Sequence, residues 1–289
     1  MAPIGQERRC HSDRFGQCED AALNNDEPSI TTGKAGGSKQ SHSTLWILFS
    51  VGGFFLVWAV TAYRLDDNSL PGPLAVWESV ITEWQSGELL FHLGATLIRV
   101  AAAFAVAMFI GSAIGIWMGM NRSADRILSP WLILLLNVPA LVIIVLSYIW
   151  FGLNEAAAIG AVALNKIPNV AVTLREGARS LSPEFAEMAT VYRFGAGKRL
   201  LHVVLPQLQP FFAAATRSGI ALIWKIVLIV ELLGRSNGVG FQIHLYFQLF
   251  DVATILAYTL AFVVVMLIVE YLVLQPLDRQ ANRWRGAHG

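Results

Sequence analysis

Six long apolar segments, separated by shorter polar ones, dominate the pattern of hydrophobic and polar positions along the chain. A helix of about 20 residues rises about 30 Å, which is the thickness of the hydrocarbon core of a bilayer. The segment lengths therefore predict about six transmembrane helices and an all-α, polytopic membrane protein. The predicted spans are Thr44–Tyr63, Val100–Asn121, the segment between Arg126 and Glu155, Ala156–Leu174, about Phe211–Leu233 and about Val252–Leu274.

The third predicted span is longer than a bilayer requires, and it contains Pro139. Proline lacks a backbone N–H and its ring clashes with the preceding turn, so it kinks a helix. We therefore expect a kink or a tilt in this span.

The polar segments are predicted to be loops and tails. Residues 1–43 are rich in Gly, Ser, Asp, Asn and Gln without apolar periodicity, which predicts a disordered tail. Such a long polar stretch before the first apolar run is unlike a signal peptide. Residues 64–91 form a predicted external loop and residues 276–289 a C-terminal tail, with a core at residues 92–275 between them.

Composition agrees with a membrane protein. Only 14% of the 289 residues are charged, 55% are hydrophobic, and the mean hydropathy is +0.54. Soluble domains average about 25% charged residues. The net charge of +1 gives no general electrostatic attraction to nucleic acid, which we exclude as a partner.

The distribution of Lys and Arg predicts the orientation. If the N-terminus is cytoplasmic, the cytoplasmic segments that follow the second, fourth and sixth spans hold ten basic residues, and the external loops hold Arg64 and Arg235. Cytoplasmic loops carry the excess of basic residues in membrane proteins. We therefore expect both termini, and the loop at residues 175–206, on the cytoplasmic side.

No catalytic or metal site is indicated. Cys10 and Cys18 lie in the N-terminal tail with His11 between them, which is too few ligands for structural zinc, so free thiols are expected. The Gly-rich stretch "GRSNGVG" at 234–240 lacks the pattern of a phosphate-binding loop and predicts a turn. The remaining histidines are scattered along the chain.

The second predicted span contains two overlapping G-x-x-x-G units. Small residues at this spacing line one helix face and allow another backbone to approach closely. They indicate either a dimer interface or packing within one subunit, and we favour packing within one subunit. The glycines are Gly111, Gly115 and Gly119.

Three cations, Lys166, Arg217 and Lys225, fall within predicted spans. A charge at the centre of a membrane helix costs about 2.5–3.5 kcal/mol, so such residues usually face protein or water. One interpretation is a path for an anionic solute. The more common one is snorkelling to the interface, or pairing with a carboxylate such as Glu231.

The loop at residues 175–206 combines helix signals with a glycine break. Ser182 as N-cap and Pro183 at the first position predict a helix that ends near Tyr192. After the break at residues 194–197, a second short helix is predicted at 198–204, and Pro206 is expected to end it. The first helix has an apolar side that fits either a partner's groove or the membrane surface. That side comprises Phe185, Met188, Val191 and Tyr192.

This stretch resembles the EAA loop of permease subunits of binding-protein-dependent ABC importers. Glu187 and Ala189 match the Glu-Ala-Ala motif, Met188 replaces its first alanine, and residues 203–206 match the Val-x-Leu-Pro ending. Arg193 stands where the family has glycine, so we expect the hinge at Gly195 and Gly197 instead. The stretches "LPGPLAVWESV", "HLGATLIRVAAAF", "PALVIIVLSYIWFG" and "ELLGRSNGVGFQI" resemble the nitrate/taurine/alkanesulfonate branch.

The resemblance implies a type I ABC importer permease in the bacterial plasma (inner) membrane. Its partners would be cytosolic ATPase subunits that use ATP and Mg²⁺, an external solute-binding protein, a second permease copy and membrane lipid. This chain would bind no cofactor and catalyse nothing, and its cargo would be a small anion. The residues expected to couple it to the ATPase are Glu187, Met188, Ala189, Tyr192, Gly195, Gly197, Leu205 and Pro206.

Two other classes of protein are weaker alternatives. A secondary transporter driven by an ion gradient would favour acidic residues in mid-membrane, but Glu231 and Glu270 lie near the ends of their spans. A membrane enzyme would need an active-site constellation, which the sequence lacks.

Overall fold

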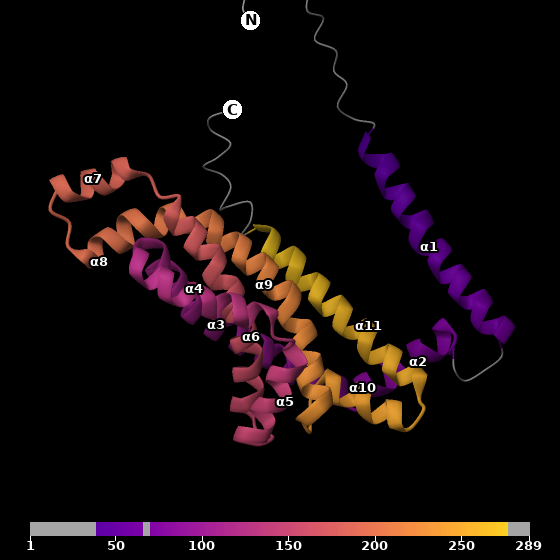
Figure 1. Ribbon diagram of the computed structural model, residues 1–289. Helices are drawn as coiled ribbons and strands as arrows, with labels where there is room; N and C mark the ends of the chain where they lie inside the picture. Colours follow the sequence, from indigo (N-terminus) through magenta and orange to yellow (C-terminus); the bar gives the residue numbers. More distant parts are fainter. Residues whose placement is uncertain (1–38, 66–69, 277–289) are drawn as a thin grey trace, which may run out of the picture. The chain divides into compact units, whose positions relative to one another are not determined.

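The computed structural model describes residues 39–65 and 70–276, and every regular element in those ranges is helical (Figure 1). The chain divides into two units, Met1–Val51 and Gly52–Gly289, and the helices described below lie in the second unit apart from the start of α1. The elements are α1 (Lys39–Leu65), α2 (Pro73–Gln85), α3 (Glu88–Met120), α4 (Arg122–Asn137), α5 (Ala140–Phe151), α6 (Glu155–Arg179), α7 (Pro183–Val191), α8 (Ala196–Arg199), the π-helical turn η1 (Leu200–Val204), α9 (Leu205–Gly234), α10 (Val239–Gln248), α11 (Val252–Val269) and the π-helical turn η2 (Glu270–Leu274).

Four of the described helices are long and apolar enough to cross a membrane. They are Glu88–Met120, Glu155–Arg179, the continuous helix Ala196–Gly234 and Val252–Leu272. The bent pair α4 and α5 makes a fifth span if the two helices count as one. The prediction of an all-α, polytopic membrane protein is confirmed.

The third predicted span is broken rather than merely kinked. Helices α4 and α5 meet at 96° across Val138 and Pro139. Val138 is extended, with φ −74° and ψ 126°, because a residue before proline is pushed out of the helical region. The 12 residues of α5 are too few to cross a bilayer alone.

The first predicted span, Thr44–Tyr63, lies within α1, which starts earlier, at Lys39. Residues 39–43 are therefore helical rather than part of the predicted tail, whose remainder, with Cys10 and Cys18, lies outside the described residues. The apolar part, Phe49–Arg64, is shorter than the other spans. Of the predicted C-terminal tail, only residue 276 is described.

The predicted external loop at residues 64–91 contains a helix, α2, which packs against α11. Its Glu83 carboxylate accepts hydrogen bonds from the hydroxyls of Tyr246 (3.0 Å) and Tyr258 (2.7 Å). Burial, reinforced by Glu83, raises the pKa of Tyr246 to about 12, so this hydroxyl keeps its proton. These bonds attach α2 to α10 and α11.

The core of the second unit is the contact between α3 and α6, with α9 packed against both. The three glycines of the G-x-x-x-G units face α6. A Cβ atom at Gly111, Gly115 or Gly119 would lie 2.7, 2.4 and 2.4 Å from the nearest atom of α6. Because real Cβ atoms do not approach so closely, only glycine permits this helix spacing. The glycines thus serve packing within one subunit.

Candidate functional site

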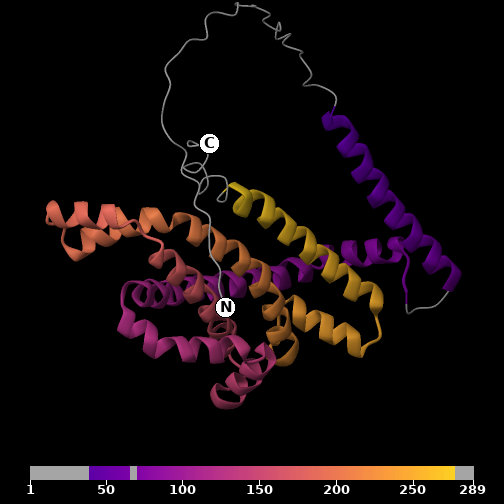
Figure 2. The same ribbon diagram turned by 45° about the horizontal axis from the view of Figure 1, so that its top comes forward.

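The segment that resembles the EAA loop forms a helical hairpin of α7 and α8. Both views show it projecting beyond the ends of the neighbouring helices (Figures 1 and 2). Helix α7 runs from Pro183 to Val191, close to the predicted bounds. The Ser182 side chain makes no capping bond, and its backbone N–H donates to Gln207 Oε1 at 3.1 Å. This bond joins the start of α7 to the start of α9.

Helix α7 has one buried side and one exposed apolar side. Ala189 is 2% exposed, whereas Val191 and Tyr192 are 78% and 70% exposed. Phe185 and Met188 are also exposed, at 49% and 41%. An exposed apolar face of this kind on a short helix is typical of a surface that docks into a groove or rests on a membrane.

The turn at the end of α7 lies at Arg193 and not at the predicted Gly195 and Gly197. Arg193 adopts the left-handed conformation, with φ 51°. Its N–H donates to Thr190 O, and the N–H of Phe194 donates to Ala189 O, at 3.0 and 2.9 Å. This bonding pattern is a Schellman cap, in which the left-handed position is usually glycine. The turn therefore stays where the family has glycine, and arginine adopts it.

Neither Gly195 nor Gly197 is the hinge. Gly195 is extended, with φ −63° and ψ 158°, a conformation open to any residue. Gly197 lies inside α8, and a Cβ on either glycine would meet no atom within 4 Å. The prediction of a displaced hinge was wrong because a substituted residue can still adopt αL when its neighbours form the cap.

Leu205 and Pro206 do not interrupt the helix, contrary to the prediction. Helix α8, η1 and α9 form one continuous helix of 39 residues, Ala196–Gly234. In the π-helical turn η1, the N–H of Leu205 donates to Leu200 O, five residues earlier. This widened turn precedes Pro206, and such π-bulges accommodate a residue that cannot donate an N–H bond. The second short helix and the fifth span are thus one element.

The three predicted path cations do not share one surface. Lys166 on α6 is 2% exposed, and its Nζ donates to Ser218 O on α9 at 3.3 Å. Arg217 and Lys225 are both exposed on α9. The Nζ of Lys225 lies 5.5 Å from the ring centroid of Trp224. Glu231, suggested as a partner for these cations, has different partners.

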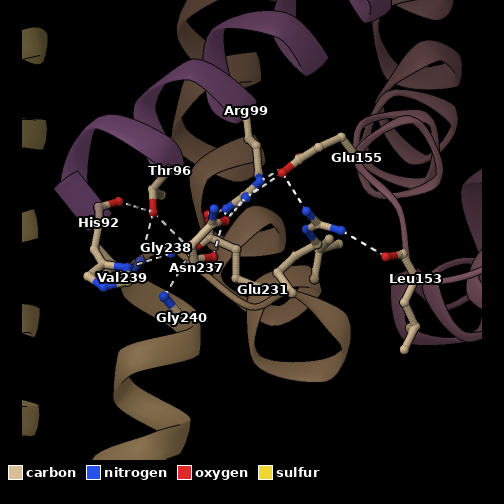
Figure 3. Close-up of polar contacts among 12 residues, drawn as sticks. His92, Thr96, Arg99, Leu153, Glu155, Glu231, Asn237, Gly238, Val239 and Gly240 are labelled. Carbon is tan, nitrogen blue, oxygen red and sulfur yellow. Dashed lines mark hydrogen bonds and ion pairs between the residues drawn. The ribbon is translucent and has the colours of Figure 1, made fainter.

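Glu231 belongs to a buried polar network that the sequence analysis did not predict (Figure 3). Its carboxylate is fully buried and accepts a bond from Arg99 Nη1 at 2.7 Å. The hydroxyl of Thr96 and the N–H of Gly240 each donate to it at 2.9 Å. The three donors come from α3 and α10. The positive charge of Arg99 and the two further hydrogen bonds compensate the buried negative charge of Glu231.

Arg99 is the centre of this network. Its Nε and Nη2 donate to the two oxygens of Glu155 at 2.8 and 2.6 Å, a bidentate pair. It also donates to the backbone carbonyl and the side-chain oxygen of Asn237. Arg235 completes the set, with 2.6 Å to Glu155 Oε1 and 2.9 Å to Leu153 O. Two arginines and two glutamates make the network electrically neutral.

The Gly-rich stretch 234–240 wraps around the Glu231 carboxylate. Gly238 has φ 109°, and a Cβ there would lie 2.4 Å from Glu231 Cδ. Its N–H donates to His92 Nδ1 at 2.9 Å, and the N–H of Val239 donates to Thr96 Oγ1 at 2.8 Å. These two bonds connect the turn and the start of α10 to α3. The turn expected from the glycines is thus the backbone part of an ion-pair cluster.

The signal for the network was present in the sequence. The predicted second span begins at Val100, directly after Arg99, but α3 starts at Glu88 and Arg99 lies inside it. A cation within a span is usually paired, so Arg99 called for an acidic partner, and the fold shows which acids these are, Glu155 and Glu231. In the part of the chain that the structure describes, no group of His, Cys, Asp and Glu could hold a metal ion.

Fold and site together define an all-α, multi-span membrane protein that carries a projecting helical hairpin between two of its spans. Residues 107–275 match the family model described as "binding-protein-dependent transport system inner membrane component". The chain belongs to this family.

Curated relatives share similar sequence over most of their length. The taurine transport system permease protein TauC of Escherichia coli is 27% identical over 235 residues, covering 79% of this chain and 85% of TauC. A Bacillus subtilis protein named as an aliphatic sulfonates transport permease is 29% identical over 76% of this chain and 79% of its own. The bicarbonate transport system permease protein CmpB of Synechococcus elongatus is 28% identical over 66% and 73%, respectively.

A solved structure shares the fold. The crystal structure of an amino acid ABC transporter with histidines superimposes with a TM-score of 0.54 and 20% identity, covering 69% of this chain and 96% of that one. At this level of identity, the similarity concerns the fold alone.

Proposed function

We propose that this chain is the transmembrane subunit of an ATP-driven importer and that α7 couples it to a cytosolic ATPase. The observation that carries the proposal is the exposed apolar face of α7, anchored through the buried Ala189 and the Ser182–Gln207 bond. A short helix held at both ends moves as one body, so it can transmit a displacement. Membership in the binding-protein-dependent family supports this assignment.

In the proposed assembly, each subunit has a separate role. ATP and Mg²⁺ are bound by the partner ATPase, a solute-binding protein delivers cargo from outside, and a second copy of this chain completes the path. The basic residues of the 175–206 loop support a cytoplasmic position for α7 and for both termini. ATP can then shift the permease between states only through contacts that differ between them, and α7 provides such contacts.

The proposed cargo is a small oxyanion. Three relatives are named for taurine, aliphatic sulfonates and bicarbonate, which all carry an anionic oxygen group. In this chain, Arg217 and Lys225 are exposed on α9, within a helix that is long and apolar enough to cross a membrane. An exposed cation that faced lipid there would be costly. Cations that face a water-filled path instead would attract an anion.

Cysteine crosslinking tests the coupling proposal. We expect Met188→Cys, on the exposed face of α7, to crosslink to the ATPase in the assembled, working transporter. Thr190→Cys is the matched control, since it lies about 200° around the same helix and should crosslink weakly. A working complex without a crosslink from position 188 would contradict the proposal. Solute uptake that persists after loss of the ATPase would instead favour an ion-gradient-driven secondary transporter.

A further inference from the structure

A basic cleft of about 1040 Å³ lies between α4 and the ends of α3 and α6. Its polar end is lined by Arg122, Asp125, Arg126 and Arg179, and its other end by Pro130 and Ile133. Along α4, Arg122 and Ile133 are about 16 Å apart at 1.5 Å per residue. The lining therefore changes from charged to apolar along the length of one helix.

Two charges in this cleft are not balanced by the residues that the structure describes. Asp125 pairs with Arg179 at 2.5 Å and with Arg175 at 3.5 Å, and Glu176 pairs with the same two arginines. This group is neutral. Arg122 and Arg126 are exposed and form no ion pair within 4.0 Å in the described residues. The cleft thus has an excess of two positive charges.

The position of these two arginines is unfavourable for the isolated helix. They are four residues apart, so their like charges repel on one face of α4. Arg122 is also the first residue of α4, where the helix dipole disfavours a cation. Asn121 Oδ1 already accepts the N–H groups of Ser123 and Ala124, so guanidinium groups rather than backbone amides are free to bind an anion.

We propose that this cleft, the α4 cleft, binds the phosphate of an anionic phospholipid. The guanidinium groups of Arg122 and Arg126 match a phosphate in charge and in bidentate geometry. The apolar lining near Ile133 fits the start of an acyl chain, which a small soluble anion lacks. Trp117 and Trp131, exposed on α3 and α4, suit the level of the headgroups, where tryptophan is enriched. The proposal depends on the membrane location of the chain and not on its cargo.

Native mass spectrometry of the full permease–ATPase complex tests the site. The complex is purified from membranes and titrated with phosphatidylglycerol or phosphatidylethanolamine. We expect selective retention of phosphatidylglycerol and about 30-fold weaker binding in Arg122→Gln/Arg126→Gln, since each basic group near an anionic surface contributes about fivefold. The control Lys198→Gln/Arg199→Gln removes equal charge outside the cleft and should retain the lipid.

Two results would contradict the proposal, one for the site and one for the lipid. Equal retention by the cleft variant, the control and the wild type would overturn the site. Binding of inorganic phosphate with no preference between the two lipids would overturn the lipid assignment. Arg122→Lys/Arg126→Lys, which keeps the charge but not the planar fork, should bind phosphatidylglycerol with intermediate affinity. Intact assembly of each variant is confirmed by size-exclusion chromatography.

Discussion

At the scale of single residues, the conformation of Arg193 shows that a helix cap can form without glycine at its left-handed position. The cap bonds to Thr190 and Ala189 hold an arginine in the left-handed region. That conformation costs a residue with a Cβ atom about 1–2 kcal/mol. The substitution therefore leaves the geometry of the hairpin intact and reduces its stability.

We predict that Arg193→Gly stabilises the end of α7. Relief of the left-handed strain, less the greater chain entropy of glycine, should amount to about 1 kcal/mol. Hydrogen exchange of the backbone amides at positions 193 and 194 should be about fivefold slower in the variant than in the wild type. Gly195→Ala, at an extended and open position, is the control and should change exchange little. Faster exchange in Arg193→Gly would contradict the assigned cap.

A second prediction at the residue scale concerns the buried pair of Arg99 and Glu231. Removing one partner of a buried ion pair leaves an uncompensated charge and costs about 3–5 kcal/mol. We expect Glu231→Gln to lower the thermal unfolding temperature strongly. Arg99→Met/Glu231→Met should lose less than the sum of the losses in Arg99→Met and Glu231→Met, a coupling that this double-mutant cycle measures.

The exposed pair of Glu176 and Arg179 is the control for this experiment, because its side chains are 52% and 42% exposed. Such surface pairs contribute about 0–1 kcal/mol. Glu176→Gln should therefore shift the unfolding temperature much less than Glu231→Gln. Equal shifts would mean that the network does not act as a buried cluster.

At the scale of elements, the spacing of α3 and α6 rests on their glycines. We predict that Gly115→Ala destabilises the protein by about 1–3 kcal/mol, since its Cβ would lie 2.4 Å from the backbone oxygen of Ala171, which cannot rotate away. Gly94→Ala, on the same helix with no atom within 4 Å, should be neutral or stabilising. Thermal unfolding of the purified permease compares the two.

Sequence patterns predicted the elements well where local chemistry decides them. The sixth span was predicted at Val252–Leu274, which α11 and η2 occupy together, and α7 begins at the predicted Pro183. The prediction was wrong at Pro206, because a π-helical turn can accommodate a proline. Whether a helix continues through a proline in this way depends on its packing, which a hydropathy pattern does not predict.

The polar network was not predicted because its partners are distant along the chain. Arg99 and Glu231 are separated by 132 residues, and each alone looks like the boundary of a span. Only the fold shows that a charge is inside a span and paired. The glycines at 238 and 240 likewise indicated a turn, without indicating that the turn encloses a carboxylate.

At the scale of the whole molecule, α3, the start of α6 and the end of α9 are joined by ion pairs, whereas α7 projects beyond the neighbouring helices. We infer that the networked helices move together during transport and that α7 transmits the force. In the proposed assembly, the exposed cations on α9 would face the translocation path or a second copy of this chain.

The last prediction concerns that path. If Lys225 faces the cargo, Lys225→Gln should raise KM for an anionic solute about tenfold, since a hydrogen bond to a charged group contributes about 1.5–3 kcal/mol. Lys225→Arg keeps the charge and should stay within a few-fold of the wild type. Basal ATPase activity, measured in the same proteoliposomes, should be equal in all three proteins, because Lys225 is not among the residues proposed to contact the ATPase. A fall in uptake for Lys225→Gln and Lys225→Arg alike would indicate a packing role, and unchanged KM in Lys225→Gln would remove Lys225 from the path. Arg217→Gln then asks whether the neighbouring exposed cation of α9 contributes to the same attraction.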